Sequence, residues 1–157
     1  MPALKGLQKE IVFIMKLLLI VALLTIATDK EKDQAKKDLD GLQGTWVMAG
    51  LEVEGKQVPE EKIKGTTLTI KGDKYIVKTR EATHEVTFRL DPAQKPKAID
   101  MYFPDGPELP KLAKGIYELD GDTFRICRAQ APGQDRPREF VTETNTGRFI
   151  VTWKRHK

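Results

Sequence analysis

The sequence predicts an all-β fold, an antiparallel up-and-down β-barrel of about eight strands with a short N-terminal helical turn. Short segments of alternating apolar and polar residues follow one another, separated by Gly, Asp and Pro. No crossover helix is indicated between them, which favours an antiparallel, meandering sheet. Trp46 stands in the first segment and Arg155 ends the last. In a closed barrel these strands are neighbours, so we expect the guanidinium to stack on the indole at the seam.

The N-terminal residues have the order of a secretory signal peptide. Basic residues precede an uninterrupted apolar run of 11 residues, 17–27, and residues 28–30 are polar. The run is shorter than the about 20 residues that a membrane-spanning helix needs. We therefore expect residues 1–27 to be a cleaved signal peptide, with Met1 or Met15 as the true start. The protein is then exported, either to the periplasm or beyond the cell.

Cleavage would leave 130 residues, enough for one domain with its own core. Residues 28–40 carry many charges of both signs and few apolar groups, which indicates a solvated linker or a short helix. Residues 41–157 form the expected barrel domain. The formal net charge is +4, but no basic cluster is interleaved with aromatic residues, so nucleic acid is not an expected partner. Cys127 is the only cysteine and cannot form an internal disulfide.

The strands are expected in a regular order along the chain. They cover residues 44–53, 66–71, 74–79, 84–90, 98–103, 115–119, 123–128, 138–143 and 148–154. Turn residues at 72–73 and 120–122 join adjacent runs and predict two tight hairpins. Prolines within 91–97 and 104–114 exclude a central strand and predict loops.

One face of these strands is apolar, which predicts a core inside the barrel. The expected inward residues are Trp46, Met48, Leu68, Ile70, Tyr75, Val77, Val86, Phe88, Leu90, Ile99, Met101, Phe103, Tyr117, Leu119, Phe124, Ile126, Phe149, Val151 and Trp153. The first strand fits less well, because Val47, Ala49, Leu51 and Val53 fall on the outer face. Either the preceding linker covers that strand, or its register is shifted by one residue.

Residues 38–46 resemble the start of lipocalins, a short helical turn followed by Gly-x-Trp, and Arg155 resembles the arginine that packs across that tryptophan. A closer similarity is to an uncharacterised lipocalin-like domain family of planctomycete-type bacteria. It rests on five stretches in order: 42–46, 95–100, 115–119, Ile126-Cys127, and Arg136-Pro137 with Phe140. The resemblance covers roughly residues 40–155. It implies a lipocalin-like fold and export but no activity, because a fold does not carry a function with it.

Catalysis and metal binding have little support in the sequence. His84 and His156 are the only histidines, and no pair of His or Cys residues has the spacing of zinc ligands. We therefore expect a non-enzymatic protein without metal or cofactor. Asp100 is unusual because it lies in the middle of an expected strand, where Asp is disfavoured. We expect Arg125 or Arg136 to pair with it, either as a strand-to-loop ion pair or as a small polar site.

Two functions remain open at this stage. An eight-stranded barrel is just wide enough to be filled by side chains or to hold one small ligand. The first function is an exported binding protein for a small, mostly apolar ligand. Its expected wall residues are Met48, Phe88, Met101, Phe103 and Tyr117. The second is a filled barrel that serves as a structural or protein-interaction module of the cell envelope. There the outer apolar residues of the first strand, such as Leu51, would meet a protein partner.

Overall fold

The computed structural model describes residues 15–16, 29–104 and 111–157. The chain divides into two compact units, Met1–Gln34 and Ala35–Lys157. In the first unit the described residues, 15–16 and 29–34, are helical. The expected signal peptide falls outside the described residues, except for 15–16. Among the helices that the structure describes, none combines the length and the apolar character needed to cross a membrane.

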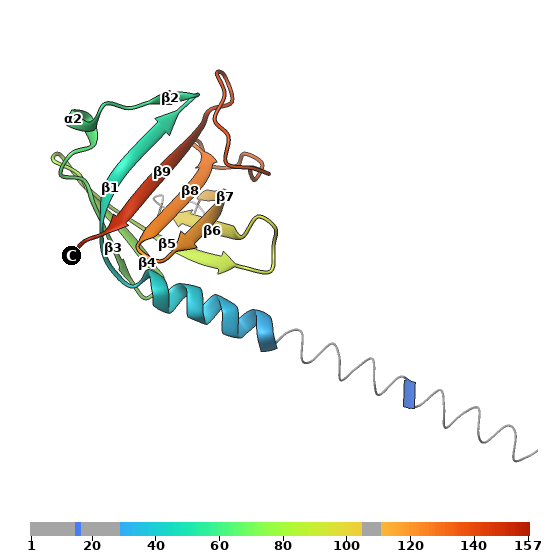
Figure 1. Cartoon of the computed structure of the whole chain (residues 1–157). Helices are drawn as coiled ribbons and strands as arrows, with labels where there is room; N and C mark the ends of the chain where they lie inside the picture. The colour runs from blue at the N-terminus through green and yellow to red at the C-terminus, as the bar shows by residue number, and fades with distance from the viewer. Residues whose placement is uncertain (1–14, 17–28, 105–110) are drawn as a thin grey trace, which may run out of the picture. The chain divides into compact units, whose positions relative to one another are not determined.

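The second unit is a closed antiparallel β-barrel, as the sequence predicts (Figure 1). Its eight strands are β1 (Gly44–Val53), β3 (Thr67–Lys71), β4 (Lys74–Lys78), β5 (Thr83–Asp91), β6 (Ala98–Phe103), β7 (Lys111–Asp120), β8 (Thr123–Ala129) and β9 (Arg148–Arg155). Each strand pairs with the next along the chain, and β1 pairs with β9 to close the barrel. A short strand, β2 (Lys56–Gln57), folds back on β1, and α2 (Glu60–Ile63) leads towards β3.

The segment expected as a charged linker or a short helix is helical from residue 29, and the helix continues to residue 42. Its last turns, residues 35–42, belong to the second unit and run almost directly into β1 (Figure 1). Leu42 is fully buried in the barrel core, and Leu39 packs against that core. These two leucines explain why a helix stands here, because they give an otherwise charged segment one apolar face.

One expected strand is absent, and another strand begins earlier than expected. No strand forms at 138–143, where residues 130–147 run as an irregular segment. Its apolar residue Phe140 packs instead on a small cluster on the outer face of the barrel. Strand β7 begins at Lys111, four residues earlier than expected, and pairs with β6 along that length. The prolines that predicted a loop stop just before it, and proline is tolerated at the edge of a strand.

The core lies inside the barrel and contains all the residues expected to point inward. Aromatic rings fill much of it. Trp46 and Tyr117 lie 5.9 Å and 6.4 Å from Phe124 between ring centroids, and Tyr75 lies 6.3 Å from both Phe88 and Trp153. Three of these four contacts are edge-to-face, the arrangement that aromatic quadrupoles favour.

The irregularity of the first strand is a β-bulge. The register between β1 and β9 skips Ala49, so the alternation of faces reverses beyond it. Leu51 then pairs with Val151 and packs against the barrel core. Of the two alternatives for this strand, the register shifted by one residue is therefore confirmed beyond Ala49, and Leu51 and Val53 do not lie on the outer face. The protein-interaction surface that was built on Leu51 loses its main residue.

A second, smaller cluster lies on the outer face of β7, β8 and β9. Ile116, Cys127 and Ile150 are buried there, and Phe140 of the irregular segment packs against them. The segment 130–147 thus covers outward apolar residues that would otherwise meet water. Among the described residues, the large apolar side chains left exposed are Met15 and Val141.

A candidate binding site at the open end of the barrel

The two ends of the barrel differ in what covers them. At the closed end, residues 35–42 meet β1 beside the β3–β4 turn, which Gln43 joins through its side chain. The opposite end, called the open end below, carries β2, α2 and the irregular segment 130–147 (Figure 1). The candidate site is at the open end. The closed end provides a comparison, because polar side chains there are paired with other groups of the protein.

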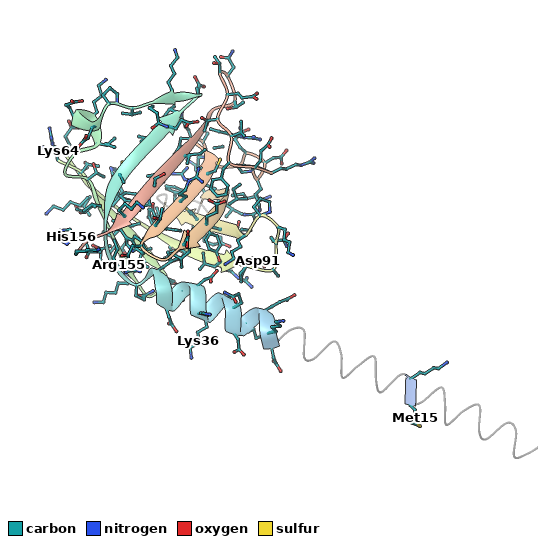
Figure 2. All side chains as sticks on the ribbon, in the orientation of Figure 1. Met15, Lys36, Lys64, Asp91, Arg155 and His156 are labelled. Atoms are coloured by element: carbon teal, nitrogen blue, oxygen red, sulfur yellow. The ribbon has the colours of Figure 1, made fainter. Side chains whose placement is uncertain are left out.

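Arg155 lies across Trp46 at the closed end. The guanidinium carbon is 4.0 Å from the centroid of the Trp46 ring, and the two residues are direct partners in the β1–β9 register. Arg155 is therefore held by the sheet in the position where the cation meets the indole face. Its Nε also lies 3.4 Å from the Asp122 carboxylate in the β7–β8 turn. Figure 2 shows Arg155 next to His156, near the end where the helix enters β1.

The same pair caps the helix. Arg155 donates hydrogen bonds to the carbonyl oxygens of Gln43, at 3.0 Å, and Gly41. Trp46 donates from its indole N–H to the Leu42 carbonyl at 2.9 Å. These carbonyls are at the C-terminal end of the helix, where no intrahelical donor is available and a cation is favoured. The barrel seam and the helix end therefore share one set of contacts.

A second buried polar group ties the helix to the barrel. Asp38 is 6% exposed, and its Oδ2 accepts hydrogen bonds from the Tyr117 hydroxyl at 2.6 Å and the Lys97 ammonium at 2.7 Å. Burial, together with the hydrogen bond and the charge of Asp38, raises the pKa of Tyr117 above its ordinary value. Tyr117 was expected in the ligand-binding wall, but the structure places it here, at the closed end.

A cleft of about 600 Å³ lies at the open end of the barrel, where β4, β5 and β6 rise past the core. This volume is within the range of pockets that hold small molecules. The lining residues are Tyr75, Val77, Thr83, His84, Glu85, Val86, Met101, Phe103, Pro104 and Arg128. Tyr75, Val77, Val86, Met101 and Phe103 lie on the inward face of their strands. The cleft is therefore continuous with the open-end part of the core.

Of the five expected wall residues, Met101 and Phe103 line this cleft. Phe88 lies deeper, 5% exposed, with its ring edge against Tyr75. Met48 packs against the core from β1 and does not line the cleft. The structure thus brings two of the five together at the open end and distributes the other three through the filled part of the barrel.

Of the ten lining residues the sequence analysis expected only Met101 and Phe103 in the wall, and Arg128 is one of the eight that it missed. Arg128 follows Phe124 and Ile126 on the inward face of β8, and its guanidinium lies 4.6 Å from the Phe149 ring centroid and 5.2 Å from that of Phe103. Burial lowers the pKa of Arg128 below its ordinary value, yet an arginine remains protonated in proteins. The alternation of the strand was the available signal, because it places a third inward residue two positions after Ile126.

Small residues on β7 make room for this arginine. Ala113 and Gly115 occupy the inward positions of the strand on its open-end half, where longer side chains would stand. A Cβ at Gly115 would lie 3.1 Å from the Arg128 Cβ and 3.0 Å from the Cys127 carbonyl oxygen. Both distances are too short for ordinary packing, so the glycine permits the close approach of β7 and β8 beside Arg128.

Tyr75 lines the cleft, and its ring packs against the buried indole of Trp153. Burial raises the pKa of Tyr75, and the nearby N–H of Trp153 opposes this rise in part. The contact between Tyr75 and the Trp153 N–H does not reach hydrogen-bond geometry. The Trp153 Nε1 is therefore without a partner in the part of the chain that the structure describes. A buried donor without an acceptor is uncommon in folded proteins.

Asp100 pairs with Arg136 at 2.7 Å on the outer side of the sheet. Arg136 also donates to the carbonyl oxygens of Ile99, at 3.1 Å, and Gly115, at 2.6 Å. Arg125, the other expected partner, instead pairs with Glu118 at 2.9 Å. The Asp100–Arg136 pair therefore anchors the irregular segment 130–147 to β6 and β7, as a strand-to-loop ion pair would.

Within the described residues, no group of three or more His, Cys, Asp or Glu side chains is placed to hold a metal ion. No protein-family model, curated protein or solved structure matches the chain. The lipocalin-like fold class accordingly rests on the structure described above, and the resemblance to a planctomycete-type family stays a prediction.

Proposed function

We propose that this protein is an exported, non-enzymatic lipocalin-like binding protein that holds one small, mostly apolar molecule in the open-end cleft. The observation that carries the proposal is the cleft itself, about 600 Å³ in volume and walled by inward apolar side chains. Val77, Val86 and Phe103 supply apolar walls, and Met101 supplies an adaptable one. A concave, largely apolar site with a few polar groups is the usual form of a small-molecule site.

The filling of the barrel limits where such a ligand can lie. Trp46, Tyr117 and Phe124 are each at most 1% exposed and pack together at the closed end. Interiors packed at this density have no room for a ligand without displacing side chains. The proposed ligand therefore occupies only the upper part of the barrel, with part of its surface near the mouth.

The proposed export of the protein rests on the sequence of residues 1–27, which lie almost entirely outside the described residues. The test is N-terminal sequencing of protein recovered from the periplasmic or secreted fraction of an expressing bacterium. A start close to residue 28 supports export with cleavage. An intact N-terminus in the cytoplasmic fraction contradicts it and leaves the cleft unaffected.

Ligand binding in the cleft is tested with an uncharged fluorescent probe, N-phenyl-1-naphthylamine, whose fluorescence increases in apolar surroundings. Val77 is partly buried and lines the cleft, so Val77→Trp should fill it. Ile76 is its neighbour on the opposite face of β4, and Ile76→Trp is the matched control. We expect saturable binding by the wild type, loss in Val77→Trp, and wild-type binding in Ile76→Trp.

Two results would overturn the binding proposal. One is the absence of saturable probe binding by the wild-type protein, which would favour the filled barrel as a structural or interaction module. The other is unchanged binding by Val77→Trp, which would place the probe outside the cleft. Circular dichroism of both variants should first show that the barrel is intact.

A further inference from the structure

Arg128 is an unusual residue for the wall of an apolar cleft. It points to the inside of the barrel from β8, while its strand neighbour Arg125 lies on the outer face and pairs with Glu118. A charged group on the apolar face of a strand loses hydration and contributes little to packing beyond its stem. Such a residue needs either an internal partner or a reason to be accessible from the cleft.

The internal partners of Arg128 are few. Its Nη1 donates to the carbonyl oxygens of Ala129, at 2.8 Å, and Gln130, at 3.4 Å, the next two residues of its own chain. No described carboxylate forms an ion pair with it. Glu85 is the one acidic side chain among the described residues that line the same cleft, and it is paired with Lys74 at 2.6 Å.

The surroundings of Arg128 fix its position without neutralising its charge. Phe149 and Phe103 provide two ring faces, and a cation over such a ring is attracted by the ring quadrupole. A guanidinium has five N–H donors in a rigid plane. Among the described residues only Nη1 is used in hydrogen bonds, so within that part of the chain the plane keeps donors that a planar anion can accept from in a bidentate manner.

We propose that the ligand of the open-end cleft is an apolar molecule with one anionic head group, a carboxylate, which Arg128 binds. This inference rests on the proposed function and gives the chemical class of its ligand. The apolar part lies against Val77, Val86 and Met101, and the carboxylate lies on the guanidinium plane beside Phe103. A cation in a mostly apolar site then serves to orient the ligand and to select against uncharged molecules of the same shape.

The experiment compares two probes that differ only in the head group, dodecanoate and 1-dodecanol, each below its aggregation limit. Both are measured by displacement of N-phenyl-1-naphthylamine from the mature protein. The variants are Arg128→Met, which keeps an unbranched stem, and Arg128→Lys, which keeps the charge but not the planar fork. Arg125→Met, on the outer face of the same strand, is the matched control.

We expect the wild type to bind dodecanoate about ten-fold or more tightly than dodecanol, which corresponds to about 1.4 kcal/mol. Arg128→Met should lower dodecanoate affinity to that of the alcohol and leave the alcohol unchanged. Arg128→Lys should retain part of the preference, and Arg125→Met all of it. Higher salt should weaken dodecanoate binding more than dodecanol binding.

Equal affinity of the wild type for the two probes would overturn this inference and leave the binding function standing. A carboxylate preference that persists in Arg128→Met would overturn it as well, since the selecting cation would be another group. The wild-type comparison needs no variant, so the inference remains testable if Arg128→Met does not fold. Absence of all probe binding would remove the proposed function and this inference together.

Discussion

Two arginines stand on the inward face of the barrel at its two ends, and each lies over aromatic rings. Arg155 covers Trp46 and donates to two carbonyls at the end of the helix, with Asp122 nearby. Arg128 lies over Phe103 and Phe149 and, within the part of the chain that the structure describes, donates only to the two residues that follow it. The hydrogen bonds of Arg155 go to groups distant in sequence, and those of Arg128 go to the end of its own strand.

The difference separates a structural cation from one available to a ligand. Contacts between distant segments are lost together when a residue such as Arg155 is removed, because several elements depend on it. Contacts of Arg128 with its own strand end hold no other element in place. The closed end should therefore respond to substitution with a loss of stability, and the open end with a change in binding.

The largest effect is expected from Trp46→Ala at the closed end. Trp46 is fully buried and contacts both the helix end and Phe124, so its removal should lower the free energy of unfolding by about 3–5 kcal/mol. Phe103→Ala at the open end removes a partly buried ring and should cost about half as much or less. Urea denaturation measures both. Equal losses would remove the distinction between the two ends.

The bulge in β1 gives the next prediction. Leu51→Asp places a charge on the inward face and should destabilise the barrel by about 2–3 kcal/mol. Ala49→Asp places the same charge at the exposed bulge residue and should change stability by less than about 0.5 kcal/mol. If Leu51→Asp were as mild as Ala49→Asp in thermal unfolding, the register would lack the bulge.

The two arginines themselves provide a direct comparison. Arg155→Ala removes the stacked cation and two charged hydrogen bonds and should cost about 2 kcal/mol. Arg128→Met keeps the contact of its stem with the phenylalanine rings and removes a partly buried charge, so it should change stability by less than about 0.5 kcal/mol. Chemical denaturation of the pair checks this. A larger loss in Arg128→Met would make that residue structural too.

The last effect is confined to alkaline pH. The folded state raises the pKa of Tyr117, through burial and Asp38, and of Tyr75, through burial, above the ordinary value of 10.0. The stabilisation of the folded state by these two raised pKa values is complete below pH 10. It is lost as pH rises, because the tyrosines of the unfolded chain release their protons at a lower pH than those of the folded chain. The loss is about 1.4 kcal/mol per pH unit for each tyrosine.

Tyr117→Phe and Tyr75→Phe should each make the alkaline decline less steep, and stability curves between pH 9 and 11 measure this. At pH 7, Tyr117→Phe should also cost about 1 kcal/mol, since Asp38 loses a donor. A wild-type decline that is unchanged by both substitutions would contradict the pKa assignment at both ends.

Much of the fold could be predicted from sequence because alternation reports directly on burial. The inward residues, the strand order and the contact of Trp46 with Arg155 follow from period and position alone. Leu51 could not be placed, because a bulge changes the phase without a sequence signature at Ala49. The strand expected at 138–143 failed because Phe140 is apolar for a different reason, the cover of an outer cluster.

The site was less accessible to sequence reasoning than the fold. Aromatic residues that fill a barrel and those that line a cleft have the same pattern, so Tyr117 and Phe103 could not be separated. What separates them is the helix end, with Asp38 bound to Tyr117 at one end of the barrel only. Arg128 was missed because the expected strand was judged by its apolar residues, and an inward cation breaks that rule.

The seam between β1 and β9 also has a consequence for the order in which the protein assembles. Arg155 bonds to a carbonyl 112 residues earlier in the chain, so the contact that closes the barrel joins the first strand to the last. Until β9 has been synthesised, β1 and β8 have open edges and the helix end lacks its cation. Closure is thus a late, long-range step, and the barrel interior becomes a defined container only when the final strand is in place.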